Sequence, residues 1–263
     1  MLNYIQAEFY KLFRRKYTYI ALGGLLVLEA LFASMFAFHN SHAFAAPFAD
    51  AVVSIVELGS IGFCTCMFTG DIVFAGQYKN STLKNEVSFG LSRTRIYLGK
   101  LIAQTLLSIL YMVVMMGFFL ALCAIVLPHD PQFAISEGFI GDTGALQIVG
   151  YFLAVGLPLW VGAQAALCMC LFLIHSDMAA SFAYLGIIFG ANTVLELTGL
   201  LIRGGAGETL LKICGYLPAP LLDGAKAVVG SWAYLGKAWL VGAFWVAAST
   251  AAGLYGFHRK EIK

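Results

Sequence analysis

Residues 76–100 read GQYKNSTLKNEVSFGLSRTRIYLGK and form a charged segment in an otherwise apolar chain. Glu86 is the only acidic residue in this charged segment, and its basic residues are Lys79, Lys84, Arg93, Arg95 and Lys100. On both sides the chain is almost wholly apolar for about 20 residues or more, which is the length of a bilayer-spanning helix. This alternation predicts a membrane protein with a water-exposed connection at this point.

The composition indicates a protein that is embedded in lipid rather than dissolved in water. Of the 263 residues, 60% are hydrophobic and 11% are charged, whereas about 25% of the residues in a soluble domain are charged. Most of the 16 Lys and Arg residues lie in the first sixteen residues, in the charged segment and in the last six residues. Clusters of this kind indicate membrane topology. They do not form the basic, aromatic-rich face of a nucleic-acid-binding protein.

Six apolar segments are long enough to cross a bilayer as helices. They are residues 17–38, 51–74, 101–127, 146–174, 178–202 and 235–257. Their apolarity is continuous rather than alternating, which favours helices over barrel strands. The sequence therefore predicts an all-α polytopic membrane protein with six transmembrane helices, organised as one domain over residues 1–263.

The basic clusters also predict the orientation of the chain. The connections at residues 40–50 and 128–145 contain no Lys or Arg, whereas the charged segment and both ends of the chain are basic. The positive-inside rule then places both termini and the charged segment in the cytoplasm. The connection at residues 203–234 carries basic residues as well, but the alternation of six spans assigns it to the outside.

Two further segments are predicted to lie at the membrane surface. Residues 1–16 place apolar side chains at helical spacing, which is typical of an amphipathic interfacial helix; the alternative is an irregular basic tail. Residues 203–234 are too apolar for an ordinary loop and too short to span twice. Two re-entrant helices joined by a turn at Pro218, Ala219 and Pro220 fit this connection best.

The charged segment has the local signals of a short helix. Asn80 or Ser81 can cap a helix over residues 82–88, Gly90 can end it in the left-handed conformation, and Ser92 can cap the next helix. The alternative is a plain basic loop that only sets the topology.

The same residues resemble a known family. Asp71, the run Tyr78–Asn85, the run Ser88–Arg93 and the run Ile96–Lys100 match the block that follows the second helix in type-2 ABC exporter permeases. The N-terminal Glu8, Lys11 and Arg14 and the C-terminal run Phe257–Ile262 are similar as well. The resemblance is specific over residues 71–100 and extends to the layout of all six spans.

The resemblance implies a partner and a role for the charged segment. Such permeases form homodimers, or heterodimers with a sister permease, and bind two ATPase subunits on the cytoplasmic face. Their short helix between spans two and three is a coupling helix, in which Leu83 and Val87 would enter a groove of the ATPase. The residues that carry this role by resemblance are Thr82, Leu83, Lys84, Asn85, Glu86, Val87, Gly90 and Arg93.

No motif in the sequence predicts catalytic or nucleotide-binding activity for this chain. The sequence contains no G-x-x-x-x-G-K-[ST] loop for nucleotide phosphates, so we expect ATP and magnesium to bind the partner ATPase. His175, Ser176 and Asp177 are adjacent and cannot form a hydrolase triad with one another; we expect a tight turn in which Asp177 caps the following helix. We expect no cofactor, metal or catalytic residue in this chain.

The substrate follows from the resemblance alone. A small subunit without a fused ATPase resembles the branch that exports amphipathic, antimicrobial or toxin peptides in the bacterial inner membrane. The alternatives are export of drugs or lipids, or ion-coupled secondary transport.

Two sets of intramembrane residues are candidates for function. Glu29, Glu57 and Glu196 could line the translocation path and attract a cationic substrate, or could instead brace helices. Gly186 and Gly190 form a G-x-x-x-G pair that permits close helix packing. That packing could form the dimer contact or could lie within the chain.

Overall fold

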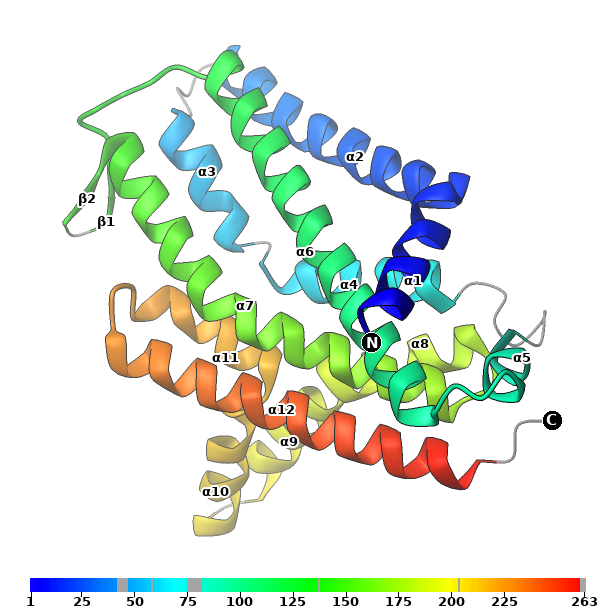
Figure 1. The fold of residues 1–263 in the computed structure, drawn as a ribbon. Helices are drawn as coiled ribbons and strands as arrows, with labels where there is room; N and C mark the ends of the chain where they lie inside the picture. The colour runs from blue at the N-terminus through cyan, green and yellow to red at the C-terminus, as the bar shows by residue number, and fades with distance from the viewer. Residues whose placement is uncertain (42–46, 58, 75–81, 137, 203, 261–263) are drawn as a thin grey trace.

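The computed structural model describes residues 1–41, 47–57, 59–74, 82–136, 138–202 and 204–260. Nearly all of this chain is helical, apart from a short hairpin of β1 (Ala134–Ser136) and β2 (Phe139–Ile140). The two strands are antiparallel and pair Ala134 with Ile140. The hairpin lies at the opposite end of the molecule from the N-terminus and the end of helix α12 (Trp232–Arg259) (Figure 1).

Within the described residues, five helical stretches are long and apolar enough to cross a membrane. They are α2 (Lys16–Ser41), α6 (Arg93–Val126), α7 (Gly141–Leu173), α8 (Asp177–Leu185) continued through a π-turn into α9 (Ala191–Leu201), and α12 (Trp232–Arg259). Each contains a long apolar run with few charges, as expected of a helix in lipid. The chain is therefore an all-α polytopic membrane protein, as the sequence predicts.

The second expected span, residues 51–74, is not one continuous helix. It is divided into α3 (Phe48–Glu57), a 3₁₀ turn (Gly59–Ile61) and α4 (Gly62–Phe74). Glycine weakens a helix, and here it also makes room for aromatic rings of α7. A Cβ atom on Gly59 would stand 2.1 Å from the Phe152 ring, and one on Gly62 would stand 3.1 Å from the indole nitrogen of Trp160. The expectation of an unbroken helix is therefore wrong, and the six-span layout stays a prediction.

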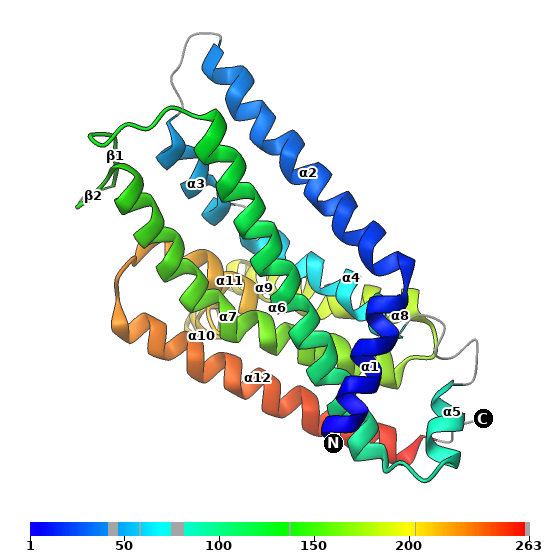
Figure 2. The ribbon, with the colours of Figure 1, turned by 45° about the horizontal axis from the view of Figure 1, so that its top comes forward.

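Helix α7 occupies the centre of the fold and packs against α3, α4, α6, α8, α11 and α12. Its closest neighbour is α12, which runs beside it in both views (Figures 1 and 2). The backbones approach where Gly162 of α7 meets Gly242 of α12. Small residues permit this kind of contact between helices in lipid.

The described part of the connection at residues 203–234, namely residues 204–234, contains two short α-helices, as expected, and a 3₁₀ turn (Ala225–Ala227). Helix α10 (Gly205–Cys214) packs back against α9, and α11 (Pro218–Gly224) packs against α7. Pro218 is the first residue of α11 rather than part of the joining turn, which suits proline because the first helical position needs no N–H donor. Whether these helices are re-entrant stays a prediction.

The turn before α8 differs from the expectation in its capping residue. The Ser176 hydroxyl, not the Asp177 carboxylate, accepts the backbone N–H of Ala179. Asp177 is the first residue of the helix, where an acidic side chain is favourable next to the helix dipole.

Candidate functional site

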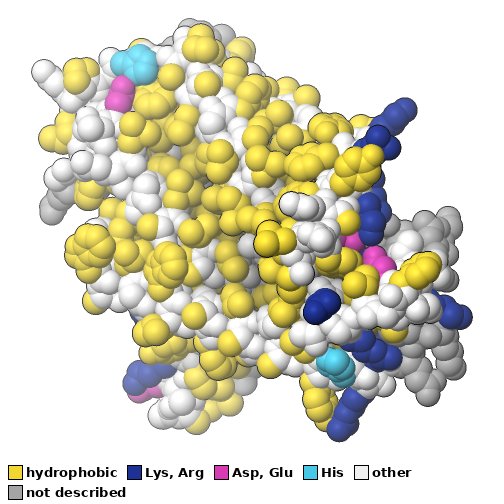
Figure 3. Space-filling view, viewed as in Figure 1, with side chains coloured by type: hydrophobic (Ala, Val, Ile, Leu, Met, Phe, Trp, Pro, Cys, Tyr) yellow, Lys and Arg dark blue, Asp and Glu magenta, His cyan; other side chains and the backbone are white. Residues whose placement is uncertain are grey.

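The described part of the charged segment, residues 82–100, lies at the same end of the molecule as the N-terminus and the end of α12. Helices α1 (Leu2–Arg14) and α5 (Thr82–Ser88), the start of α6 and the end of α12 gather there (Figures 1 and 2). Lys and Arg side chains cluster along the same edge in the space-filling view (Figure 3). Among the described residues, the exposed basic side chains at this end are those of Lys11, Arg14, Lys16, Lys84, Arg95 and Arg259.

Helix α5 has the bounds that the sequence predicts. It begins at Thr82 and ends at Ser88, and Gly90 follows with a φ of 84°. That backbone conformation is costly for any residue with a Cβ atom. Ser92 then caps α6 by accepting the backbone N–H of Arg95. The expected caps Asn80 and Ser81 lie outside the described residues.

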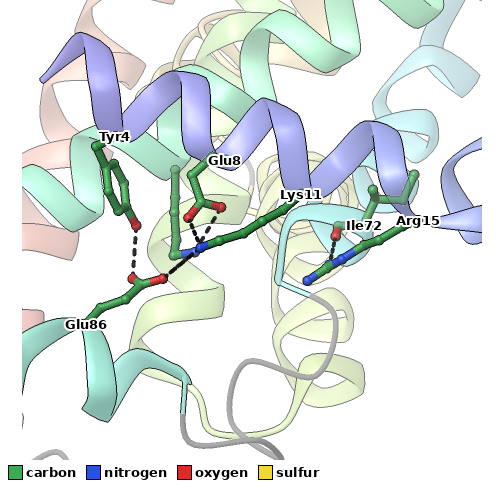
Figure 4. A network of polar contacts seen from close by, with 7 residues as sticks. Tyr4, Glu8, Lys11, Arg15, Ile72 and Glu86 are labelled. Atoms are coloured by element: carbon green, nitrogen blue, oxygen red, sulfur yellow. Dashed lines mark hydrogen bonds and ion pairs between the residues drawn. The ribbon is translucent and has the colours of Figure 1, made fainter.

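A network of polar contacts joins α1, α5 and α6, and we call its five residues the charged joint: Tyr4, Glu8, Lys11, Glu86 and Lys100. The Lys11 ammonium lies 2.9 Å from Glu8 Oε1 and 3.4 Å from Glu86 Oε1. The Tyr4 hydroxyl donates to Glu86 Oε2 at 2.9 Å (Figure 4). Lys100 lies 3.4 Å from Glu8 and 3.9 Å from Glu86. One acidic residue of α5 is thereby bound to both neighbouring helices.

The centre of the charged joint is buried. The side chains of Glu8 and Lys100 are only 3% and 4% exposed. Burial alone raises the pKa of the Glu8 carboxyl, but Lys100 and Lys11 hold that pKa below its ordinary value. Burial also raises the pKa of the Tyr4 hydroxyl, as do the charges of Glu8 and Glu86. Glu8 is therefore an anion that depends on its lysine partners.

The charged joint corrects two expectations about the surface of α5. Leu83 is only 4% exposed and belongs to the protein's own core, so the expectation that it enters a groove of the ATPase is wrong. Val87 is partly buried against the same core. Glu86 binds Tyr4 and Lys11 of α1, although the predicted coupling role would place Glu86 at the rim of the ATPase groove.

The outer side of α5 carries different residues. Lys84 and Asn85 are exposed together with Thr82 and Ser88. The Phe89 side chain, directly after the helix, is 87% exposed and is the most exposed large apolar side chain described. The sequence pattern alone does not single out Phe89 as a candidate contact residue. The available signal was an aromatic residue between the end of a short helix and its terminating glycine.

Arg93 has a role within the chain. Its guanidinium donates to the backbone oxygens of Phe257, His258 and Lys260 at 2.6–2.9 Å. These carbonyls end α12, where a cation is favourable. Arg93 therefore links the start of α6 to the end of α12 and is not a surface residue reserved for a partner.

A separate cavity of about 380 Å³ lies within the membrane-spanning region. Its walls come from α2, α3, α4, α6 and α7 and from the 3₁₀ turn at Gly59. Glu29 of α2 and Trp160 of α7 line it. Its walls are otherwise mostly apolar, which is typical of a pocket for a small molecule.

The three candidate glutamates are not brought together by the described residues. Glu29 lines the cavity, Glu196 is exposed on α9, and Glu57 is the last residue of α3 with a side chain outside the described parts. Of the two described glutamate side chains, only Glu29 lines the cavity.

The glycine pair on the fifth span lies in an unusual turn. Gly186–Gly190 form a single π-helical turn, and Cβ atoms at either glycine would meet nothing within 4 Å. In the described structure these two glycines therefore do not mediate close helix packing within the chain. A contact with a second subunit stays a prediction.

Comparisons with known proteins add one finding. A family model described as an ABC-2 family transporter protein matches residues 4–192. The match contains the charged joint, α5 and all helices that line the cavity. A comparison with curated proteins found no match.

Proposed function

Because the chain belongs to the ABC-2 family of transporter proteins, and is thus the permease subunit that works with an ABC ATPase, we propose that it exports an amphipathic or antimicrobial peptide. In this proposal two ATPase subunits bind ATP and magnesium. The permease forms a homodimer, or a heterodimer with a sister permease, and binds no cofactor. It lies in a bacterial inner membrane with both termini in the cytoplasm.

The mechanism that we propose treats α5 as the coupling helix. The observation that carries it is the contrast between the two sides of α5. One side is bound to α1 and α6 through the charged joint, while Phe89 projects away from the chain. A short helix fixed on one side transmits a displacement better than a mobile loop does. Closure of the ATPases on ATP would push on Phe89 and move α1 and α6 with α5.

Phe89→Ala should weaken the binding of the ATPase about 30-fold, because truncation of a central aromatic side chain at an interface costs roughly 2 kcal/mol or more. Transport and substrate-stimulated ATP hydrolysis should fall with it. The measurement is the affinity of the purified permease for the ATPase by surface plasmon resonance, followed by ATPase assays in proteoliposomes. The thermal stability of the permease should not change, since Phe89 is already exposed.

Phe244→Ala is the matched control. Phe244 is also exposed, but it lies on α12 within a membrane-spanning helix, so its removal should leave ATPase binding unchanged. Leu83→Ala tests the corrected assignment, because it should lower the stability of the permease rather than act at the interface. Unchanged ATPase affinity in Phe89→Ala would contradict the coupling role of α5.

Gly186→Leu and Gly190→Leu test the proposed contact between subunits. If a partner helix packs against the π-turn, a leucine there should weaken the permease dimer about tenfold, because overpacking costs roughly 1–3 kcal/mol. Single-molecule counting of labelled permease in liposomes measures the dimer fraction. Gly117→Leu, on α6 with equally open surroundings, is the control. Normal dimers in both variants would place the contact elsewhere.

A further inference from the structure

We propose that the cavity between α2, α4, α6 and α7 binds a hydrophobic organic cation that also carries a hydrogen-bond acceptor. The site lies inside one subunit and is entered from the bilayer. As a statement about the class of substrate, this inference rests on the proposed exporter function. As a statement about binding, it concerns the permease chain alone.

The cavity walls are the facing sides of regular helices. From α2 come Leu25, Leu28, Glu29 and Phe32, which recur at the three- and four-residue spacing of one helical face. The α6 wall contains Met112, Met115 and Met116, whose flexible side chains adapt to different apolar shapes. With a volume of about 380 Å³, the cavity falls within the roughly 300–1,000 Å³ range of small-molecule pockets.

Two polar atoms at this cavity are buried and have no partner among the described residues: Glu29 Oε2 and Trp160 Nε1. A buried polar group without a hydrogen bond costs free energy, and a carboxylate within the membrane is especially costly. The carboxylate calls for a cation, and the indole N–H is a donor that calls for an acceptor. A ligand that supplies both groups removes both penalties.

Two other polar residues that line the cavity, Thr69 and Gln164, are hydrogen-bonded to each other, and Gln104 bonds to Gln164 from behind the wall. The Gln164 amide donates to the Thr69 hydroxyl at 3.0 Å, and the Gln104 amide donates to the Gln164 side-chain oxygen. These groups close the cavity between α4, α6 and α7 without a ligand. The unmet hydrogen-bonding capacity of the residues that line the cavity is therefore concentrated at Glu29 and Trp160.

Trp160 is held in place by close packing. Cβ atoms on Gly62 and Gly156 would stand 3.1 Å and 3.0 Å from its ring. Gly62 begins α4, directly after the break in the second span. The break therefore creates the space that the indole occupies beside the cavity. A continuous helix with ordinary side chains at these positions would displace the indole.

The cavity opens toward lipid. Leu28 lines it and is nevertheless 63% exposed, so the mouth reaches the apolar outer surface beside α2. Few residues of α2 are covered by the rest of the chain. An apolar cation that partitions into the bilayer can reach Glu29 by this route, whereas a neutral lipid chain would leave the carboxylate unpaired.

The test uses dansylcadaverine, which combines an apolar naphthalene ring, sulfonamide oxygens and a protonated amine. Its fluorescence polarisation is titrated with the full-length permease in zwitterionic nanodiscs, and empty nanodiscs provide the background. We expect saturable binding. Glu29→Gln should weaken it roughly tenfold or more, and Trp160→Phe about three- to tenfold, from the usual strengths of charged and neutral hydrogen bonds.

Two controls separate recognition of the ligand's positive charge from nonspecific hydrophobic binding. Glu196→Gln removes an exposed carboxylate from α9 and should leave the affinity unchanged. A dansyl analogue with a hydroxyl in place of the amine should bind about tenfold more weakly to the native protein, and Glu29→Gln should not affect its binding. The unfolding temperature of each variant shows that it is folded.

The proposal is overturned if the neutral analogue binds as tightly as the amine, if Glu29→Gln binds normally, or if no saturable binding occurs. The cavity would then accommodate apolar molecules such as lipid chains without recognising charge. None of these outcomes bears on the ATPase interface, because Phe89→Ala is measured by ATPase affinity. Failure of the cation site is thus distinguishable from failure of the exporter function.

Discussion

Replacing Lys100 by Met should lower the free energy of unfolding by about 3 kcal/mol, because Glu8 is left as a buried carboxylate that has lost one of its two lysine partners. For a chain of this size that corresponds to a decrease in Tm of about 6–12 °C. Thermal unfolding of the purified permease in detergent measures it. Lys84→Met removes an exposed lysine from α5 and should have little effect on Tm.

A second substitution tests whether the unpaired charge of Glu8 causes this loss of stability. Adding Glu8→Gln to Lys100→Met removes the unpaired charge and should recover a large part of the lost stability. Equal losses in the single and double variants would show that the two side chains are not coupled.

Acidic pH should also lower the free energy of unfolding of the native protein. The folded-state pKa of Glu8 is lowered, so the ion pairs contribute stability above the ordinary pKa of 4.5, and this contribution is lost as the pH falls through the folded-state pKa. The difference between Lys100→Met and the native protein should therefore shrink below about pH 4.5.

Gly242→Val should destabilise the protein by about 3 kcal/mol or prevent folding, because overpacking against backbone is not relieved by a side-chain rotation. A Cβ atom at this position would stand 2.5 Å from the backbone oxygen of Pro158. Helix α12 would have to move away from α7, the central helix. The measurement is the yield of monodisperse protein and its Tm.

Gly236→Val is the matched control. It is the same substitution in the same helix, but a Cβ atom there would meet nothing within 4 Å. Only the small cost of a β-branched residue in a helix is expected there. Equal losses in the two variants would show that contact with α7 is not the cause.

The sequence is informative where the signal is local. The helix Thr82–Ser88, the left-handed Gly90 and the Ser92 cap follow from residues within a few positions of one another. The apolar runs of α2, α6, α7 and α12 are long and continuous, so their existence follows from composition. In each case the deciding interactions lie within a single helix or its flanking turn.

The remaining features depend on contacts between distant residues. Leu83 belongs to the core of the whole chain, and no pattern within residues 82–88 reveals which side of the helix other elements will cover. The break in the second span depends on Phe152 and Trp160 of α7. The α1 partners of Glu86, Tyr4 and Lys11, lie 82 and 75 residues away in sequence, so no local pattern reveals this pairing.

The charged joint also sets an order of events during synthesis. Helix α1 leaves the ribosome first, but the buried partner of Glu8 is Lys100, 92 residues later. At about 5–20 residues per second, Glu8 waits roughly 5–18 seconds for that partner. During this interval the carboxylate has to stay in water, because burial without Lys100 is unfavourable. Helix α1 therefore cannot be seated before the start of α6 has been made, and a nascent chain that stalls before Lys100 presents an undocked α1 to the cell's quality-control machinery.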